Sequence, residues 1–431
     1  MKNVFLFGAG FSYQFGMPLA SDLTKIFLSL FNEKNISVLI NGLSSQKPYG
    51  EEYPISKDAL KRAFDILLKY KNDPKCNNYE LVISEIYQLT KEYKYREDSN
   101  SYHLVYGYLY GIIHEILVLY QKLTFPLYQQ NKEEYKRFSH LLSKDKETWV
   151  FTLNHDLYME FLAKDFLIPI TFGDTKKISF RKDNTVNKEK IINFSYSERK
   201  EISLKNKQYF QDEYGINLVK LHGGLNELHY KDSSLICNLD LDVADSSEML
   251  KNFSDMMGMK NFAPDGRAFH SDMDWFITNM EYEGDIATKS MLTGSNKYSL
   301  TYSDKENEEK LSLFSQVLKE SDKLTIIGYG FNDEHVNNKI IRATILNEKL
   351  KIKIVDPSEG LPKPLIPIDE GDRVRKAQCD VANWIYHEEH STPTLHAWNQ
   401  ELQKYNDNNL KMREVINKVI FDYFEAYRNI T

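Results

Sequence analysis

A glycine-rich turn near the start of the chain has residues suited to holding phosphate. Gly8, Ala9 and Gly10 follow a run of apolar residues, and Ser12 comes two positions later. Glycines let backbone N–H groups face a pyrophosphate, and the Ser12 hydroxyl can add a hydrogen bond. Tyr13 interrupts the full G-x-G-x-x-G pattern, so a tight turn between a strand and a helix explains this stretch equally well.

A second group of hydrogen-bonding residues lies in the segment TLNHDLY. It offers Thr152, Asn154, His155 and Asp156 directly after a run of apolar residues. Helix capping explains Asp156 by itself, because Asn and Asp often begin a helix after a strand. Capping explains less well why three hydrogen-bonding residues cluster at this point.

A histidine follows the third apolar run, in the segment KLHGGLNELHY. His222 is followed by Gly223 and Gly224. A lone histidine is more often structural than catalytic. The two glycines leave room for a ligand, however, and an imidazole titrates near neutral pH, so His222 is a candidate general base.

Two further segments complete the set. IIGYGFNDEHV contains Gly328 and Gly330, which are typical of a second nucleotide contact, and Asp333, which is suited to capping the next helix. IVDPSEG contains Asp356, which is well placed to bind a ribose hydroxyl and equally ordinary as a turn residue.

The elements that must position these residues alternate between strands and helices. Continuous apolar runs predict five strands, at residues 3–7, 148–154, 217–223, 323–330 and 350–357. Helical spacing predicts helices at about 21–31, 156–165, 305–320 and 333–348. This alternation indicates an open parallel α/β sheet that is covered on both faces. Ligands of such sheets bind at the carboxyl ends of the strands, where all five polar segments begin.

The domain organisation follows from changes in pattern. Residues 57–143 have helical spacing throughout, which predicts a helical insertion at about 45–147 within a domain of residues 1–390. Residues 391–431 return to helical spacing and form a C-terminal helical segment. The polar stretches 174–212 and 238–300 are expected to be surface excursions or lids.

Composition excludes several classes of protein. The 431 residues carry a net charge of −7, which argues against direct nucleic-acid binding by phosphate neutralisation. Cys76, Cys237 and Cys379 lie far apart in sequence, so we expect neither a disulfide framework nor a zinc site, and no metal at all. Residues 104–120 are too short and too polar for a membrane span. We expect a cytoplasmic protein without membrane contact.

The order of the motifs resembles the sirtuin family, in particular its bacterial sirtuin-like branch. GAG-x-S is followed by T-x-N-x-D, then HG, then G-x-G-x-x-D, each at a strand end. The likeness covers roughly residues 1–30 and 147–358. It implies a Rossmann-like fold with NAD as its ligand, and it identifies GAGFS as the loop that holds the NAD pyrophosphate.

The resemblance also implies roles for individual residues. Asn154 and Asp156 would surround the nicotinamide ribose, and His222 would be the catalytic base. Gly328 and Gly330 would lie along the phosphates and ribose, and Asp356 near the adenosine ribose. The expected NAD-binding residues are Gly8, Ala9, Gly10, Ser12, Thr152, Gly328, Gly330, Asp333 and Asp356.

The chain also departs from the deacylating sirtuins. It has Leu153 where they have a glutamine, and it lacks the four zinc cysteines and the zinc-ribbon module that helps to form their acyl-peptide cleft. The remaining chemistry is cleavage of NAD⁺ by water, in which Asn154 holds the water, Asp156 fixes the ribose hydroxyls and His222 accepts a proton.

Three functions are compatible with this sequence. The first is an NAD⁺ glycohydrolase with NAD as its substrate, acting in bacterial antiphage defence, as the resemblance implies. The second is an NAD-dependent protein deacylase or ADP-ribosyltransferase. The third is a non-catalytic subunit that senses NAD or ADP-ribose. For the first we expect a homo-oligomer gated by its helical block, with a defence partner such as a translocase-type ATPase or a phage trigger.

Overall fold

The computed structural model of the chain describes residues 2–45, 54–76, 78–92, 96–184, 190–262, 273–291, 308–369, 373–389 and 400–430. Its strands are β1 (Lys2–Phe7), β2 (Glu147–Thr152), β3 (Ile170–Thr171), β4 (Lys176–Arg181), β5 (Ile191–Glu198), β6 (Gly215–Lys220), β7 (Glu227–Tyr230), β8 (Leu235–Leu239), β9 (Asp274–Thr278), β10 (Gly284–Lys289), β11 (Ser321–Ile327), β12 (Lys351–Val355) and β13 (Val374–Ala377).

Its α-helices are α1 (Ala9–Tyr13), α2 (Ala20–Ser29), α3 (Glu33–Ser45), α4 (Lys57–Lys71), α5 (Tyr79–Glu92), α6 (Arg96–Leu123), α7 (Phe125–Lys136), α8 (Tyr158–Asp165), α9 (Ser246–Met257), α10 (Glu308–Lys319), α11 (Glu334–Leu346), α12 (Val381–Glu389) and α13 (Gln400–Ile430). Three short 3-10 helices are η1 (Arg137–Leu141), η2 (Arg199–Glu201) and η3 (Lys363–Ile368).

The predicted parallel sheet is confirmed. Within the described residues, seven strands lie in the order β13-β12-β11-β1-β2-β6-β3, and every neighbouring pair is parallel. Leaving aside the two-residue edge strand β3, the remaining six strands have the doubly wound order 3-2-1-4-5-6 of a dinucleotide-binding fold. The strands β2 and β6 are added on one side of β1, and β11, β12 and β13 on the other, so the strand order reverses between β1 and β11.

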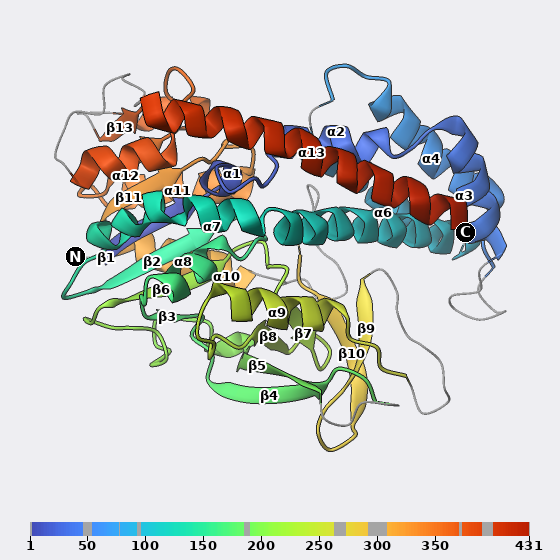
Figure 1. Ribbon diagram of the computed structural model, residues 1–431, viewed down its shortest axis with the longest axis horizontal. Helices are drawn as coiled ribbons and strands as arrows, with labels where there is room; N and C mark the ends of the chain where they lie inside the picture. Colours follow the sequence, from blue (N-terminus) through green and yellow to red (C-terminus); the bar gives the residue numbers. More distant parts are fainter. Residues whose placement is uncertain are drawn as a thin grey trace.

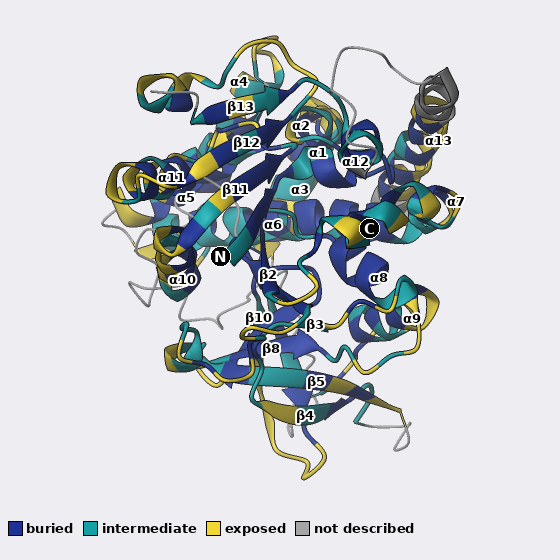
Figure 2. Cartoon of the chain, turned by 90° about the vertical axis from the view of Figure 1, so that its left-hand side faces the viewer, coloured by how far each residue is buried: buried dark blue, intermediate teal, exposed yellow. Residues whose placement is uncertain are grey.

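Alternate residues of the central strand enter two different cores. Val4 and Leu6 pack with residues of α10 and α11, whereas Phe5 and Phe7 pack with the helices of the other face. Both faces of β1 are therefore covered, which explains its uninterrupted apolar sequence. Figure 2 shows the buried central strands of this sheet between helices.

The predicted helical insertion is also present. Helices α4, α5, α6 and α7 lie between β1 and β2 in the sequence, within the predicted insertion, and α13 runs along α6 (Figure 1). The Tyr423 hydroxyl donates to Glu115 Oε1 at 3.3 Å, which joins these two helices near one end. Most of the Tyr, Leu and Ile residues of the insertion are buried within the chain's own core.

The two polar stretches differ from the expectation of surface excursions or lids. Together with β7 and β8 they build a second, antiparallel sheet in the order β4-β5-β8-β7-β10-β9 (Figure 1). An antiparallel bridge between Phe180 and Asn279 brings the two edge strands together, so this sheet is curled. One face of such a sheet can face water, and the resulting polar alternation concealed these strands in the sequence.

The helices of the described segments include none that is both long enough and apolar enough to cross a membrane.

Candidate active site

The carboxyl ends of five parallel strands gather the predicted residues along one edge of the sheet. In spatial order, the segments after β12, β11, β1, β2 and β6 carry Asp356, Gly328, Gly8, Asn154 and His222. The reversal between β1 and β11 lies at the middle of this edge. Ligands of open α/β sheets bind at such a switch point, so this is the candidate site.

The glycines at the switch point make room for each other. A Cβ atom on Gly10 would lie 2.6 Å from Gly328 Cα, and one on Gly8 would lie 2.6 Å from the Gly328 carbonyl oxygen. The N–H groups of Gly8 and Gly10 donate to the carbonyls of Ile327 and Gly328, each at 2.9 Å. These glycines therefore lock the β1 and β11 exits together, and their two N–H groups are used within the fold.

Asn154 joins the second strand exit to the glycine-rich turn. Its Nδ2 donates to the Gly8 carbonyl at 2.9 Å and to Ser12 Oγ at 3.1 Å, and its backbone N–H donates to Thr152 Oγ1 at 3.0 Å. These bonds fix the amide, so its Oδ1 is the atom that can accept a hydrogen bond from a water or a hydroxyl. The side chain is partly exposed, as a ligand-binding group must be.

Asp156 lies beneath Asn154 and shares the same serine. Its Oδ1 accepts from the N–H of Tyr158 at 3.1 Å, and its carboxyl also accepts from the Ser12 hydroxyl. Burial raises the pKa of Asp156 to about 6, against the opposing effects of Ser12, Lys220 and the Tyr158 N–H. A carboxyl group with this pKa changes its charge just below neutral pH.

His222 is paired with Asp333 across the site. The His222 Nε2 lies 2.8 Å from Asp333 Oδ2, and both side chains are almost fully buried. The other Asp333 oxygen accepts from the Val336 N–H at 3.0 Å, so this residue also caps α11, as the sequence predicts. When Nε2 carries the proton toward Asp333, Nδ1 is the ring nitrogen that can accept one.

Two histidines that received no role from the sequence are connected to this region: His155 lies near His222, and His114 interacts with His155. The His155 Nδ1 lies 3.2 Å from the Gly223 carbonyl oxygen, and its ring centroid is 6.4 Å from that of His222. His114 comes from α6, and its pKa is lowered by burial, with smaller effects from Lys289 and His155. The signal for His155 was its place inside the N-H-D motif, whereas no local pattern marks His114.

The remaining predicted residues lie further along the same edge. Gly330 is exposed in the loop after β11. Asp356 accepts from the Ser358 N–H at 2.8 Å, and one of its oxygens lies 3.8 Å from Lys376 Nζ. Both contacts belong to the local turn and to the neighbouring strand β13. Asp356 follows β12, which lies two strands from β1, so it is at the outer part of this edge. Ala9 opens helix α1 between the two glycines.

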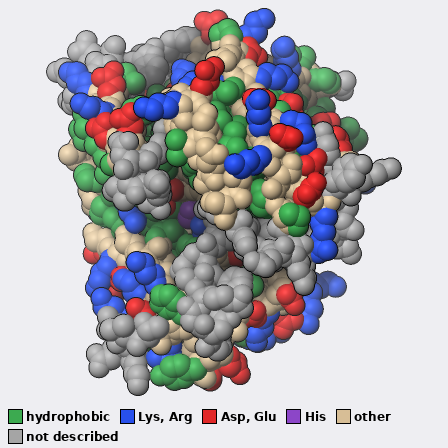
Figure 3. Space-filling view, turned by 90° about the vertical axis from the view of Figure 1, so that its right-hand side faces the viewer, with side chains coloured by type: hydrophobic (Ala, Val, Ile, Leu, Met, Phe, Trp, Pro, Cys, Tyr) green, Lys and Arg blue, Asp and Glu red, His purple; other side chains and the backbone are tan. Residues whose placement is uncertain are grey.

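Figure 3 shows a hollow on one face of the molecule in which a histidine side chain is visible. In the part of the chain that the structure describes, no three His, Cys, Asp or Glu side chains are grouped closely enough to hold a metal ion. The expectation of a metal-free site stays a prediction.

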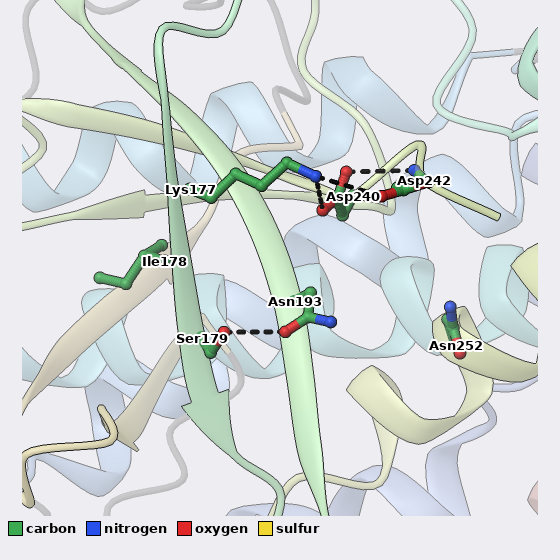
Figure 4. Close-up of a pocket in the computed structure, with 7 residues that line it drawn as sticks. All are labelled: Lys177, Ile178, Ser179, Asn193, Asp240, Asp242 and Asn252. Carbon is green, nitrogen blue, oxygen red and sulfur yellow. Dashed lines mark hydrogen bonds and ion pairs between the residues drawn. The ribbon is translucent and has the colours of Figure 1, made fainter.

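A separate pocket of about 230 Å³ lies on the antiparallel sheet (Figure 4). There Lys177 Nζ contacts Asp240 at 2.9 Å and Asp242 at 3.5 Å. Two carboxylates thus neutralise its single lysine, which makes this pocket a poor site for a pyrophosphate.

No protein-family model matches this chain, and no curated protein matches it at a significant level of sequence similarity. A proposal for its function therefore rests on the geometry at the sheet edge and on the order of the motifs.

Proposed function

We propose that this chain is a sirtuin-like NAD⁺ glycohydrolase that cleaves NAD⁺ to nicotinamide and ADP-ribose. The main support is one arrangement: Asn154 and Asp156 are both bonded to Ser12, and the His222–Asp333 pair lies at the same sheet edge. That edge has the strand order and the switch point of dinucleotide-binding folds.

The chemistry requires little beyond positioning. Nicotinamide leaves NAD⁺ as a neutral molecule, so no general acid is needed when the bond to the ribose C1′ breaks. Asn154 Oδ1 would hold the attacking water, and ionised Asp156 would fix the ribose hydroxyls. As the new bond from C1′ to the water oxygen forms, His222 would accept the proton of that water. Asp333 would orient the imidazole and stabilise its charged form.

The pyrophosphate would lie along the turn that starts with Gly8. Because the N–H groups of Gly8 and Gly10 are already bonded to β11, other groups must bind the phosphates. Ser12 is buried and bonded to the site residues, so its main role would be to align Asn154 with Asp156. The glycines would contribute by keeping the β1 and β11 exits close together.

The decisive experiment incubates the purified chain with NAD⁺ and measures nicotinamide and ADP-ribose. Equal release of both products without any added acceptor supports the glycohydrolase. Release that requires an acyl-lysine peptide, or one tightly bound zinc per chain in metal analysis, would instead favour the deacylase. Modification of an added protein would favour ADP-ribosyl transfer. Binding of NAD⁺ without turnover would favour a sensing subunit.

The proposed setting is bacterial antiphage defence in the cytoplasm. A hydrolase that was always active would deplete the NAD⁺ of its own cell, so its activity must be gated. We propose that the chain is a homo-oligomer and that a phage trigger, or a partner such as a translocase-type ATPase, releases its activity. Infection assays with the wild type and with inactive variants test this setting.

A further inference from the structure

A lysine lies fully inside the fold directly below the candidate site. Lys220 is the last residue of β6, two positions before His222, and is 2% exposed. Its place in a buried parallel strand calls for an apolar residue, and an unpaired buried ammonium is strongly unfavourable. Lys220 must therefore have compensating partners.

Each of its three N–H donors has an acceptor. Lys220 Nζ lies 2.7 Å from Glu160 Oε1, 2.9 Å from Asn226 Oδ1 and 2.6 Å from the Asp156 carbonyl oxygen. The acceptors come from α8, from the turn after β6 and from the loop after β2. Lys220 thus binds the loop that carries Asn154 and Asp156 to the turn that carries His222.

The turn is built around this side chain. A Cβ atom on Gly224 would lie 2.6 Å from Lys220 Cδ, so the second glycine of the HGG motif makes room for the lysine stem. From the other side, Lys310 Nζ donates to the Lys220 carbonyl at 3.0 Å and contacts both Glu227 oxygens at 2.7 Å. The backbone that precedes His222 is therefore held from two directions.

We propose that Lys220 is a positioning residue that sets the separation of His222 from Asn154 and Asp156. The role rests on the proposed function, because it matters only if these three residues act on one substrate. Lys220 Nζ reaches the site loop at the backbone carbonyl of Asp156. It acts through the Asp156 carbonyl and the turn after β6.

Lys220 also affects the charge of the site. The groups that influence the pKa of Asp156 are Ser12 from α1, Lys220 from β6, and Tyr158 and Glu160 from α8. Burial raises the pKa of Asp156. The charge of Lys220 lowers it, and the charge of Glu160 raises it with a smaller effect than that of Lys220. Removing both Lys220 and Glu160 charges should therefore raise the pKa of Asp156 further.

The test uses the double substitution Lys220→Met/Glu160→Gln in the full chain. Removing both charges avoids the buried, unpaired carboxylate that Lys220→Met alone would leave. The amide at position 160 can still accept the hydrogen bond of Asn226. The control is Arg62→Met/Asp98→Asn, which removes another 2.7 Å ion pair, located between α4 and α6.

We expect the Lys220 double variant to remain folded by circular dichroism and to lose at least tenfold in kcat, with KM changed less than threefold. The acidic limb of its pH–rate profile should move to higher pH. The control variant should match the wild type in both measurements. A folded Lys220 variant with wild-type kcat and an unshifted limb would overturn the proposal.

A second measurement does not depend on activity. Diethyl pyrocarbonate modifies accessible imidazoles, and peptide mapping can follow His222 against the exposed His140. Faster modification of His222 in the Lys220 variant, with His140 unchanged, supports the positioning role even if the wild type proves inactive and the glycohydrolase proposal fails. Unchanged modification of His222 would overturn the positioning role whatever the activity.

Discussion

His222 and Asp333 are 111 positions apart in sequence, and yet His222 Nε2 and Asp333 Oδ2 are 2.8 Å apart inside the fold. The two residues come from opposite sides of the central strand β1, since β6 and β11 lie on either side of it. Their contact therefore spans the switch point of the sheet. The Asp333 carboxylate can orient the His222 imidazole and stabilise its protonated form. Both effects favour an imidazole that accepts a proton as a general base.

This pair gives the first prediction. Asp333→Ser keeps a good helix cap for α11 but removes the carboxylate, and Asp333→Asn keeps both the cap and an acceptor without the charge. We expect both variants to fold and to lose about 10² to 10⁴-fold in kcat. Asp333→Ser should also lose about 1–3 kcal/mol of stability, because the buried imidazole of His222 loses its partner. Steady-state NAD⁺ hydrolysis and thermal unfolding measure the two effects. Wild-type kcat in either variant would show that Asp333 acts only as a cap.

The second prediction concerns the two residues that would handle water. Asn154→Ala and His222→Ala should each remove most turnover, by about 10² to 10⁴-fold, because each supplies a group that acts on the nucleophile. Asn154→Ala should still bind NAD⁺ in calorimetry, since its role is to position water. His140→Ala, an exposed histidine of η1, is the control and should keep full activity. Near wild-type hydrolysis by either site variant would contradict the site assignment.

The third prediction tests the contact between the glycines. Gly10→Ala would bring Cβ to 2.6 Å from Gly328 Cα, so the β1 and β11 exits must separate. We expect a loss of about 1–3 kcal/mol in the free energy of unfolding, as for other overpacked sites. The control is Gly107→Ala inside α6, where a Cβ atom would meet nothing within 4 Å. This substitution should raise the free energy of unfolding by about 0.5–1 kcal/mol, because alanine favours a helix over glycine. Urea titrations measure both effects. The steric explanation is wrong if Gly10→Ala destabilises the protein no more than Gly107→Ala does.

The fourth prediction concerns the dependence of stability on pH. Burial raises the pKa of Asp174 from 3.8 to about 7. The native state then holds a proton that the unfolded state releases, so the free energy of unfolding falls as pH rises from about 4 to 7, by roughly 3–5 kcal/mol. The side chain in Asp174→Asn cannot ionise, so the free energy of unfolding of this variant should not decrease over this pH range.

Urea unfolding of the wild type and of Asp174→Asn at pH 5 and pH 8 measures this fall in the free energy of unfolding. The variant should gain stability relative to the wild type at the higher pH, although it loses one acceptor for Ser195 or Asn238 at both pH values. Glu227 offers a contrast: burial would raise its pKa, but Lys310 and His229 lower it to about 2. Glu227 therefore stabilises the fold fully above about pH 4.5, and this contribution is lost as pH falls toward 2. Glu227→Gln should lack the rise in stability between about pH 2 and 4.5, and it should not change the difference between pH 5 and pH 8.

The fifth prediction is the oligomer. Size-exclusion chromatography with light scattering, run beside the NAD⁺ assay, should show an assembly larger than the monomer whose activity stays low until a trigger is added. Within the described part of α4 to α7, Leu81 is the large apolar side chain that stays exposed, whereas α13 exposes Val415, Val419 and Tyr423. Both surfaces are therefore worth mutating. A stable monomer with full activity and no partner would disprove the gating.

The sequence predicted the part of the fold that local patterns determine. The strands β1, β2, β6, β11 and β12 have five to seven residues each and contain several apolar residues, and their shared carboxyl edge follows from parallel pairing. By contrast, β3 has two residues, β13 contains Arg375 and Lys376, and β4 has an exposed end, so their patterns were too short or too polar to identify.

The site was predictable only residue by residue. The motifs selected Asn154, Asp156 and His222, but not the bond between His222 and Asp333, which depends on how distant strands pair. Lys220 went unnoticed because a lysine in a strand normally indicates an exposed face, whereas here three acceptors compensate for its burial. Compensation of this kind comes from tertiary contacts, which no local pattern records.

The central position of β1 has a consequence for synthesis of the protein in the cell. The partners of this first strand begin at Glu147 and Ser321, so the ribosome must make most of the chain before the middle of the sheet can close. At about 5–20 residues per second, that delay is roughly 15–60 s. His222 would gain its carboxylate partner only after Asp333 has emerged. A nascent chain shorter than this therefore lacks the His222–Asp333 pair, and any activity that depends on this pair can begin only after Asp333 has been made.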